Sequence, residues 1–441
     1  MGEAAAVVGG GIAGLLAANV LSEFFERVVL FERDELPDAP APRKGVPQAR
    51  HVHVLLAAGA SVLDELLPGL FDDIAALGGF DGRHGARQQL VSLRHLEAAH
   101  RVRRQRAHAE PRCAGARATH ASAGRAAGVA SPCHGRARDL GKCKPRLEFA
   151  GERQEFDLLV DAAGRGSRLS DWLEASGYAR PREEKVRVDV SYTTARYRPR
   201  RERDWQALLV YPHPPAERRA GGVFPIEDGV ELGGLFGWCG ERAEPNDAAF
   251  ADYARSLPQP EVAEYLEHAE RVSDFSTYLY REARWLHYEE LGRSAPRTCA
   301  LGDAVCSVDP VFGQGMTVAA LSARLLRDAA RAAQAEAARF APQFAKRLPS
   351  VCQGAWLLST AEDFRYPQVG GKRPFGTPLS HWYTRHVHRL CGRDDDVYRR
   401  FARVMHLLDS PASLFHPSVV GKVLLAAARG DAGVAERPRS V

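Results

Sequence analysis

Apolar residues near the start of the chain predict a strand, a tight turn, a helix and a second strand. Residues 4–8 are entirely apolar, as in a strand buried on both faces, and three glycines follow them at once. Apolar and small residues then fill 12–21, which predicts a helix, and residues 28–31 form a second apolar strand that ends on Glu32. Strand, glycine turn, helix, strand and acid is the order of the βαβ unit that binds dinucleotides.

The rest of the chain contains both strand-like and helical patterns. Apolar residues tend to alternate along 186–197 and 206–238, with Gly and Pro turns between, which predicts an antiparallel sheet. Short apolar runs at 156–160 and 298–301 predict two further buried strands. The remaining predictions are a Pro-rich loop over 36–47, helices over 52–67, 248–255, 262–271 and 316–345, and a mainly helical segment from 356 onward.

These patterns predict an α/β fold with a Rossmann-like domain, an antiparallel-sheet domain and a helical C-terminal region. The length of 441 residues favours more than one domain, since single cores usually split at this size. The predicted Rossmann-like domain is assembled from 1–92, 147–185 and 296–347, the sheet domain is 186–295, the helical region is 348–441, and 93–146 stands apart.

Residues 93–146 differ from the rest of the chain in composition. They hold 11 Arg and 2 Lys against 3 acidic residues, a balance of +10, whereas the whole chain carries +5. They contain no Phe, Tyr, Trp or Ile, so they cannot build a core. Three interpretations stay open: a segment translated out of frame, a flexible basic insertion, and a nucleic-acid arm. The third lacks the aromatic residues that such arms interleave, so no nucleic-acid partner is expected.

Several classes of protein are disfavoured by what the chain lacks. No apolar run approaches the roughly 20 residues of a membrane-spanning helix, and no signal peptide precedes the first strand. We therefore expect a cytoplasmic protein without an integral membrane span. The eight cysteines form no CxxC pair, so neither a zinc ribbon nor a disulfide framework is predicted. Without GxSxG, Walker or HExxH motifs, the chemistry must come from a cofactor.

The glycine turn near the N-terminus has the spacing Gly9-x-Gly11-x-x-Gly14. The first glycine permits the tight turn, the second lets the backbone approach a pyrophosphate, and the third lets helix and strand pack closely. Glu32, eighteen residues beyond Gly14, can accept hydrogen bonds from ribose hydroxyls. An acid here favours an adenosine ribose without a 2′-phosphate, which both FAD and NAD satisfy.

A second motif distinguishes between these two cofactors. Residues 301–320 read LGDAVCSVDPVFGQGMTVAA, so a strand delivers Gly302 and Asp303, and a loop then leads to the start of a long helix. The aspartate can hold ribityl hydroxyls, while backbone amides and the helix dipole can stabilise negative charge on a reduced flavin. This segment resembles the GD motif of the FAD-dependent monooxygenases of the p-hydroxybenzoate hydroxylase fold.

Further segments resemble one branch of these enzymes. Residues 43–53 read RKGVPQARHVH, residues 161–168 read DAAGRGSR and residues 363–367 read DFRYP. With the GQGMT run, these segments are similar to the squalene-epoxidase-like polyene epoxidases of polyether antibiotic pathways and their bacterial relatives. The resemblance covers about residues 4–92 and 147–425 and leaves out the basic window.

The resemblance implies an FAD-dependent monooxygenase that epoxidises or hydroxylates an apolar or polyene-like small molecule through a C4a-hydroperoxyflavin. NAD(P)H is the candidate reductant, and a separate flavin reductase is the alternative, because Ala163 replaces the aspartate that related hydroxylases use for both FAD and NADPH. Two other activities stay open: a flavin-dependent reductase or dehydrogenase, and a damaged, non-catalytic family member. A halogenase is disfavoured because no WxWxIP segment is present.

The predicted site residues follow from these motifs. Arg43 and Gln48 suit an anionic pyrimidine edge, because they offer a cation and an amide. His51 and His53 are candidates for a polar role near the flavin, with packed or surface histidines as the alternative. No metal site is predicted, because no third ligand lies near them in sequence. The predicted cofactor contacts are Gly9, Gly10, Gly11, Ala13, Gly14, Glu32, Arg33, Arg43, Gln48, Gly302, Asp303, Pro310, Gly313, Gly315 and Met316.

Overall fold

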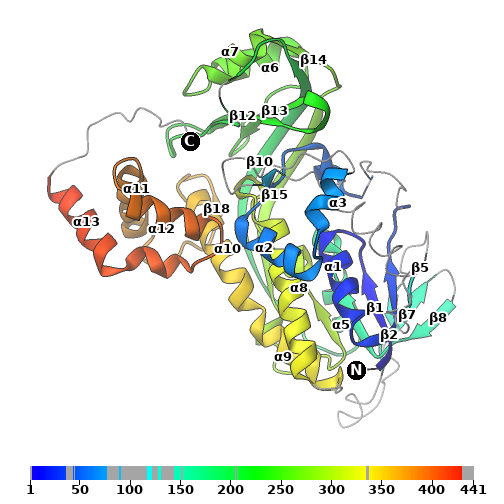
Figure 1. Cartoon of the computed structure of the whole chain (residues 1–441). Coiled ribbons are helices and arrows are strands. Elements are labelled where there is room, and N and C mark those ends of the chain that lie inside the picture. The colour runs from blue at the N-terminus through cyan, green and yellow to red at the C-terminus, as the bar shows by residue number, and fades with distance from the viewer. Residues whose placement is uncertain are drawn as a thin grey trace.

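The computed structural model describes most of the chain as two large sheets, two small sheets and a set of helices (Figure 1). The described residues are 2–35, 43, 45–76, 89–90, 117–121, 128–130, 144–149, 152–203, 205, 207–333 and 337–429. Within these ranges, no helix combines the length and the apolar composition needed to cross a lipid bilayer.

Five parallel strands form the first sheet, in the order β16-β9-β1-β2-β5. This confirms the predicted Rossmann-like arrangement, because strands far apart in sequence lie side by side and all run in the same direction. The strands are β1 (Gly2–Val8), β2 (Phe25–Phe31), β5 (Arg117–Ala121), β9 (Leu158–Asp161) and β16 (Thr298–Ala300).

Two of the small strands of this region come from the basic window 93–146. The edge strand β5 pairs with β2, and β6 (Gly128–Ala130) pairs with β7 (Arg146–Phe149), which in turn pairs with β8 (Glu152–Glu155). Apart from these strands and residues 144–145, the window lies outside the described residues. The three interpretations of its composition stay predictions.

Helices pack on the parallel sheet and join it to the rest of the molecule. Helix α8 contacts α1, α2, α9 and α10, so it forms the central helix of the lower half of Figure 1. The helices are α1 (Ile12–Leu21), α2 (Ala57–Leu66), α3 (Leu70–Ala76), α5 (Leu169–Ala175), α8 (Gly315–Ala332), α9 (Ala337–Arg347) and α10 (Pro349–Asp363).

The second sheet is antiparallel, in the order β11-β12-β13-β10-β15-β17, with β14 and β18 also paired to β10. Its alternating pattern was visible in the sequence, although two of its strands come from outside 186–295. The strands are β10 (Arg182–Pro199), β11 (Leu208–Val210), β12 (Arg219–Pro225), β13 (Glu231–Gly237), β14 (Ala269–Arg271), β15 (Ser276–His287), β17 (Cys306–Ser307) and β18 (Gly370–Gly371). Helices α6 (Asp247–Arg255) and α7 (Glu261–Glu267) cover its far end (Figure 1).

One hydrophobic core joins the two sheets. Val7 of the parallel sheet, Tyr192 and Trp238 of the antiparallel sheet and Leu326 of α8 belong to the same buried cluster. The two domains are therefore intimately packed, and residues from both can contribute to one site.

Three predicted helices have different bounds in the structure. The helix predicted over 52–67 begins only at Ala57, because Val54–Leu55 pair with Gln89–Leu90 as strands β3 and β4. The helix predicted over 262–271 ends at Glu267, because the next residues pair with β10. The single helix predicted over 316–345 is two helices, α8 and α9. The change of direction lets Phe340 and Phe344 of α9 enter the main core.

The predicted helical C-terminal region is present, and it projects to the left in Figure 1. Its helices are α11 (Thr377–Cys391), α12 (Asp395–Met405) and α13 (Pro417–Ala428). They have a small core of their own around Val387, Val397 and Val419. Helix α10 connects this region to the main body, since it contacts α8 and α9.

Candidate functional site

The glycine turn after β1 has the tight geometry that the sequence predicts. Gly9 has φ +102°, and a Cβ placed there would lie 2.4 Å from the Ala162 carbonyl oxygen. A Cβ on Gly14 would lie 1.8 Å from the Gly9 carbonyl oxygen, so α1 crosses the strand end at backbone contact. A Cβ on Gly11 would meet no atom within 4 Å. The turn therefore leaves open space at Gly11, the position where a pyrophosphate would approach.

Glu32 lies beside this turn, at the end of β2. Its carboxylate accepts a hydrogen bond from the Gly10 amide at 2.5 Å and lies 3.5 Å from the Arg43 guanidinium. Arg43 is buried and also donates to the Gly10 carbonyl oxygen at 3.0 Å. Arg33 is exposed and turned toward Asp34 and Gly45. Glu32 and Arg43 are thus held at the glycine turn, whereas the Arg33 side chain lies on the surface.

The two sequence motifs meet in space. Gly302 has φ +64°, and a Cβ there would lie 2.9 Å from the Ala13 Cβ in the first turn of α1. The strand-end turn Gly302–Ala304 therefore packs directly on the helix that follows the glycine turn. Residues separated by nearly 300 positions are therefore in direct contact, as a site for a single extended cofactor requires.

Asp303 lies in a basic environment next to this contact. Burial raises the pKa of its carboxyl group, while the positive charges of Arg165 and Arg284 lower it in part. Arg165 is held in place because its guanidinium donates to the Ser307 hydroxyl at 2.9 Å and stacks on the Tyr280 ring at 4.6 Å. Asp303 is thus a half-buried acid near two arginines, which suits a residue that binds hydroxyl groups.

The loop after Pro310 leads into the uncapped end of α8. Pro310 and Gly315 are exposed, Gly313 has the left-handed φ of +65°, and Met316 is buried. Gln314 is fully buried, yet neither polar atom of its amide has a hydrogen-bond partner among the described residues. No side chain caps α8, so its first backbone amides are also available to a ligand.

The flavin expected from the sequence fits this arrangement. An open glycine turn for a pyrophosphate, an acid beside it, a half-buried aspartate and the amide-rich start of α8 lie next to one another. The unpartnered Gln314 amide supplies a donor and an acceptor, which a flavin pyrimidine edge could satisfy.

His51 and His53 have different surroundings. His51 is buried, its Nδ1 lies 2.9 Å from the Thr194 hydroxyl, and its ring packs near Tyr192 and Tyr278 of the antiparallel sheet. The Nδ1 of His53 lies 2.9 Å from the His51 carbonyl oxygen. His51 thus joins the loop 43–53 to the second sheet, whereas His53 contacts its own loop. Gln48 belongs to the 3₁₀ turn Pro47–Arg50 that precedes them.

We expect His51 to stay neutral at physiological pH. Burial, together with the nearby His53 and Arg50, lowers its pKa to about 4. Because the folded pKa lies below the unfolded value, the stability contributed by neutral His51 is present above about pH 6.5 and is lost as the pH falls toward 4. The free energy of unfolding should fall by at most about 1.4 kcal/mol per pH unit in this window for one proton.

This prediction can be checked by urea unfolding between pH 4 and pH 7. A His51→Gln variant, which keeps a polar side chain without the titration, should show a shallower slope than the wild type. His213→Gln, which removes an exposed imidazole paired with Glu217, is the reference for the effect of substituting a histidine at the surface. The slope should change more in His51→Gln than in this variant. Equal slopes for the wild type and His51→Gln would contradict the buried, neutral state.

Asp161 holds the turn after β9 rather than a ligand. It is fully buried, and its carboxylate accepts hydrogen bonds from the Ala163 amide at 2.8 Å and the Ser167 hydroxyl at 2.6 Å. These contacts describe a carboxylate that caps the turn and is shielded from solvent. It is a poor substitute for the aspartate that Ala163 replaces.

Several residues of this region gave no signal as site residues in the sequence. Arg165, Arg284 and Tyr278 come from the turn after β9 and from β15, and only tertiary contacts bring them near Asp303 and His51. Alternation along β10 and β15 could have indicated which aromatic side chains share a face. The register between the strands, which decides their neighbours, is not encoded in that alternation.

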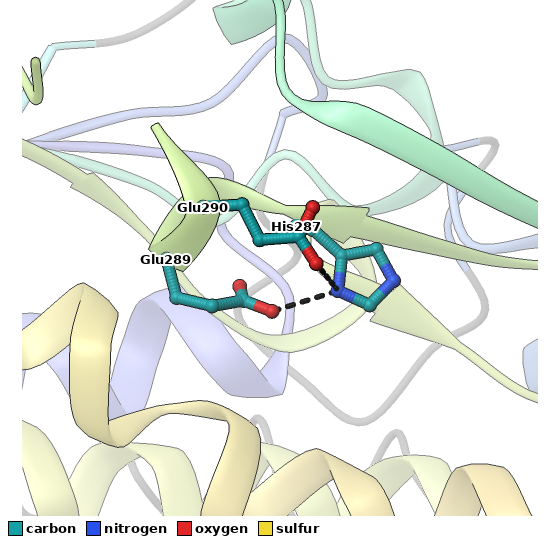
Figure 2. A group of neighbouring side chains, drawn as sticks. All are labelled: His287, Glu289 and Glu290. Atoms are coloured by element: carbon teal, nitrogen blue, oxygen red, sulfur yellow. Dashed lines mark hydrogen bonds and ion pairs between the residues drawn. The ribbon is translucent and has the colours of Figure 1, made fainter. Parts of the chain in front are cut away.

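A separate acidic cluster lies where β15 ends (Figure 2). His287 Nδ1 is 2.7 Å from Glu289 and 3.8 Å from Glu290, and these three residues are close enough to hold a metal ion. Arg182 already forms two hydrogen bonds with the Glu290 carboxylate, at 2.7 and 2.8 Å. The contacts therefore describe an ion-pair network that joins β10, β15 and the following turn.

Comparison with known proteins finds a relative at the level of sequence and several related solved structures. The chain is 31% identical over 414 residues to Protein Rv3254 of Mycobacterium tuberculosis (strain ATCC 25618 / H37Rv), which covers 86% of this chain and 83% of the relative. No family model matches the sequence.

The related solved structures are much less similar in sequence. The flavin-dependent brominase Bmp2 has a TM-score of 0.62 at 15% identity and covers 98% of this chain and 100% of its own. A flavoprotein/dehydrogenase from Cytophaga hutchinsonii has a TM-score of 0.63 at 15% identity, with coverage of 98% and 100%. A variant of 2-methyl-3-hydroxypyridine-5-carboxylic acid oxygenase has a TM-score of 0.58 at 20% identity, with coverage of 81% and 90%.

Proposed function

This chain belongs to the family of Protein Rv3254 and has the p-hydroxybenzoate hydroxylase fold of FAD-binding flavoenzymes, and from this premise we propose that it is an FAD-dependent monooxygenase. The observation that carries the proposal is the contact between the Gly302 turn and the first turn of α1 at Ala13. It joins an adenosine-binding motif to a flavin-binding motif.

Individual residues suit the parts of FAD. Glu32 would accept hydrogen bonds from the adenosine ribose, and the open backbone at Gly11 would receive the pyrophosphate. Asp303 would hold ribityl hydroxyls, and the start of α8 with Gln314 would border the pyrimidine ring. Arg43 would support the adenosine end through Glu32 rather than the pyrimidine edge, because it is paired with the glycine turn.

FAD, when bound, supplies the capacity to activate oxygen, so the protein must position the substrate and exclude water. The face of the antiparallel sheet near His51 suits an apolar substrate. Tyr192 lies 5.4 Å from Phe236 and 5.9 Å from Tyr278, measured between ring centroids. Neutral His51 adds a hydrogen-bonding group without a charge.

The finer assignment rests on the resemblance to polyene epoxidases. We infer that the reaction is epoxidation or hydroxylation of an apolar, polyene-like molecule. Electrons would come from NAD(P)H or from a separate flavin reductase, and the capping role of Asp161 favours the reductase because it leaves no free aspartate next to Ala163.

The proposal is tested with purified protein and labelled oxygen. The protein should be yellow with bound FAD, and a polyene substrate should gain one ¹⁸O atom from ¹⁸O₂ when a flavin reductase and NADH are supplied. Hydride transfer to the substrate without oxygen uptake would show that the protein is a dehydrogenase and not a monooxygenase. Halogenation in the presence of bromide would identify a halogenase instead, and a colourless protein that cannot take up FAD would overturn the proposal.

A further inference from the structure

Two aspartates from distant parts of the chain face each other in the core. Asp309 directly precedes the turn Pro310–Phe312, and Asp363 is the last residue of α10. Both residues have 0% exposure, and the Asp309 amide donates to the Ser359 hydroxyl at 3.2 Å, one turn before Asp363 on the same helix. Neither residue was predicted as part of the site, although Asp363 belongs to the DFRYP segment.

The donors around these carboxyl groups are too few for two carboxylates. Asp309 Oδ1 accepts from the Tyr192 hydroxyl at 3.1 Å and from the Val311 amide at 3.0 Å. The Trp238 indole also lowers the pKa of Asp309, whereas both oxygens of Asp363 have no donor at hydrogen-bonding geometry among the described residues. A carboxylate has no proton to donate, so the contact between the two groups requires one.

The charges around the pair lead to the same conclusion. Within the described ranges, no lysine or arginine forms an ion pair with either carboxyl group, and two buried negative charges in contact would repel strongly. Burial raises the pKa of Asp309 to about 6, and burial with the charge of Asp309 raises the pKa of Asp363 well above its usual range. The other titratable or polar neighbours are Tyr192, Tyr211, Trp238, Cys239, Tyr278, Tyr280, Glu362 and Tyr366.

We propose that Asp309 and Asp363 share one proton, so that the pair carries a single negative charge and fastens α10 to the loop 310–314. Asp363 is the protonated partner and donates to Asp309. Asp309 in turn accepts a hydrogen bond from the Val311 amide, which holds the loop. It also accepts one from the Tyr192 hydroxyl, which ties the loop to the antiparallel sheet. Both aspartates are positioning residues, because they act on the loop that would border the flavin.

The shared proton joins three parts of the molecule at one point. The loop belongs to the Rossmann-like domain, Tyr192 to the antiparallel sheet, and Asp363 to the helix that leads to the C-terminal region (Figure 1). Loss of the proton would place two charges in contact and push α10 away from the loop. The proton is inferred from the protein alone, whereas its effect on the cofactor rests on the proposed function.

Infrared spectroscopy tests the proton directly. The wild-type protein at pH 8 should show the carbonyl stretch of a buried protonated carboxylic acid, with a small shift in D₂O, and Asp363→Asn should remove it. The exposed Asp328 on α8 supplies the control Asp328→Asn, which should keep the band. Absence of this band from the wild type at pH 8 would overturn the shared proton, whether or not the protein binds FAD.

The pH dependence of stability gives a second readout. The folded pKa values lie above the unfolded value, so the stability contributed by the protonated groups is present at low pH and is lost as the pH rises through about 6 and beyond. Asp363→Asn should reduce this alkaline loss, because its amide N–H can donate to Asp309 at every pH. An unchanged slope in Asp363→Asn would count against the proposal.

FAD affinity shows whether Asp363 positions the loop 310–314 or only supports the fold. Asp363→Asn should bind FAD within about threefold of the wild type at pH 7, since it replaces the acid as donor, while Asp363→Ala should bind about tenfold more weakly. Equal affinity in all three proteins would refute the effect on the loop. If the infrared band is present but no protein binds FAD, the proposed function fails and the shared proton stands.

Discussion

A Gly11→Ala protein is expected to fold normally and to bind FAD about 100-fold more weakly than the wild type, a loss of ~2.7 kcal/mol in binding free energy. Gly11 has φ −75°, which alanine adopts without strain, and its Cβ would meet no protein atom within 4 Å. The added methyl group would instead occupy the space in which the pyrophosphate approaches the backbone. Fluorescence titration of the apoprotein with FAD measures the loss, and thermal unfolding measures the fold.

The matched control is Gly421→Ala in α13, where a Cβ also meets nothing within 4 Å. It should leave FAD affinity unchanged and raise stability slightly, since alanine is the better helix former by about 0.5–1 kcal/mol. Wild-type FAD affinity in Gly11→Ala would show that the pyrophosphate does not approach this turn. A misfolded Gly11→Ala would contradict the open space seen beside Gly11.

An Asp303→Ala protein is expected to lose FAD affinity by about 10- to 100-fold while the apoprotein becomes no less stable. Burial raises the pKa of Asp303, so its contribution to stability is present at low pH and is lost as the pH rises through the folded pKa. The charged carboxylate therefore lowers the free energy of unfolding of the apoprotein. Such a cost in stability is common for residues placed for binding. FAD titration and urea unfolding at pH 8 measure the two effects separately.

Asp328→Ala, which removes an exposed carboxylate from the same domain, is the control for this experiment. It should leave FAD affinity unchanged. If Asp303→Ala destabilises the apoprotein as much as it weakens FAD binding, Asp303 is a structural residue and does not bind the ribityl chain.

Local chemistry explains why much of the flavin site was predictable. The positive φ at Gly9 and the backbone contact at Gly14 both require glycine. The glycine spacing therefore makes the turn recognisable in the sequence. Glu32 follows a strand at a fixed distance from the turn, which places it beside Gly10. The Gly302 turn is readable for the same reason, since it has a positive φ.

Helix ends were less predictable, because tertiary contacts decided them. Nothing in the apolar pattern of 316–345 marks the end of α8 at Ala332, and the following helix α9 places Phe340 and Phe344 in the main core. The start of α2 likewise depends on the pairing of Val54–Leu55 with Gln89–Leu90. Strand pairing between segments distant in sequence overrides the local helix propensity at this position.

The sequence by itself determined the βαβ unit, the alternating sheet and the glycine positions that leave space for a dinucleotide, because each depends on neighbours close along the chain. The tertiary structure alone decided that Arg165 faces Asp303, that His51 is neutral beside Tyr192, and that Asp309 meets Asp363. These properties arise from burial and from charges that distant segments bring together. The protonation states on which the chemistry depends therefore come from the fold, not from any local motif.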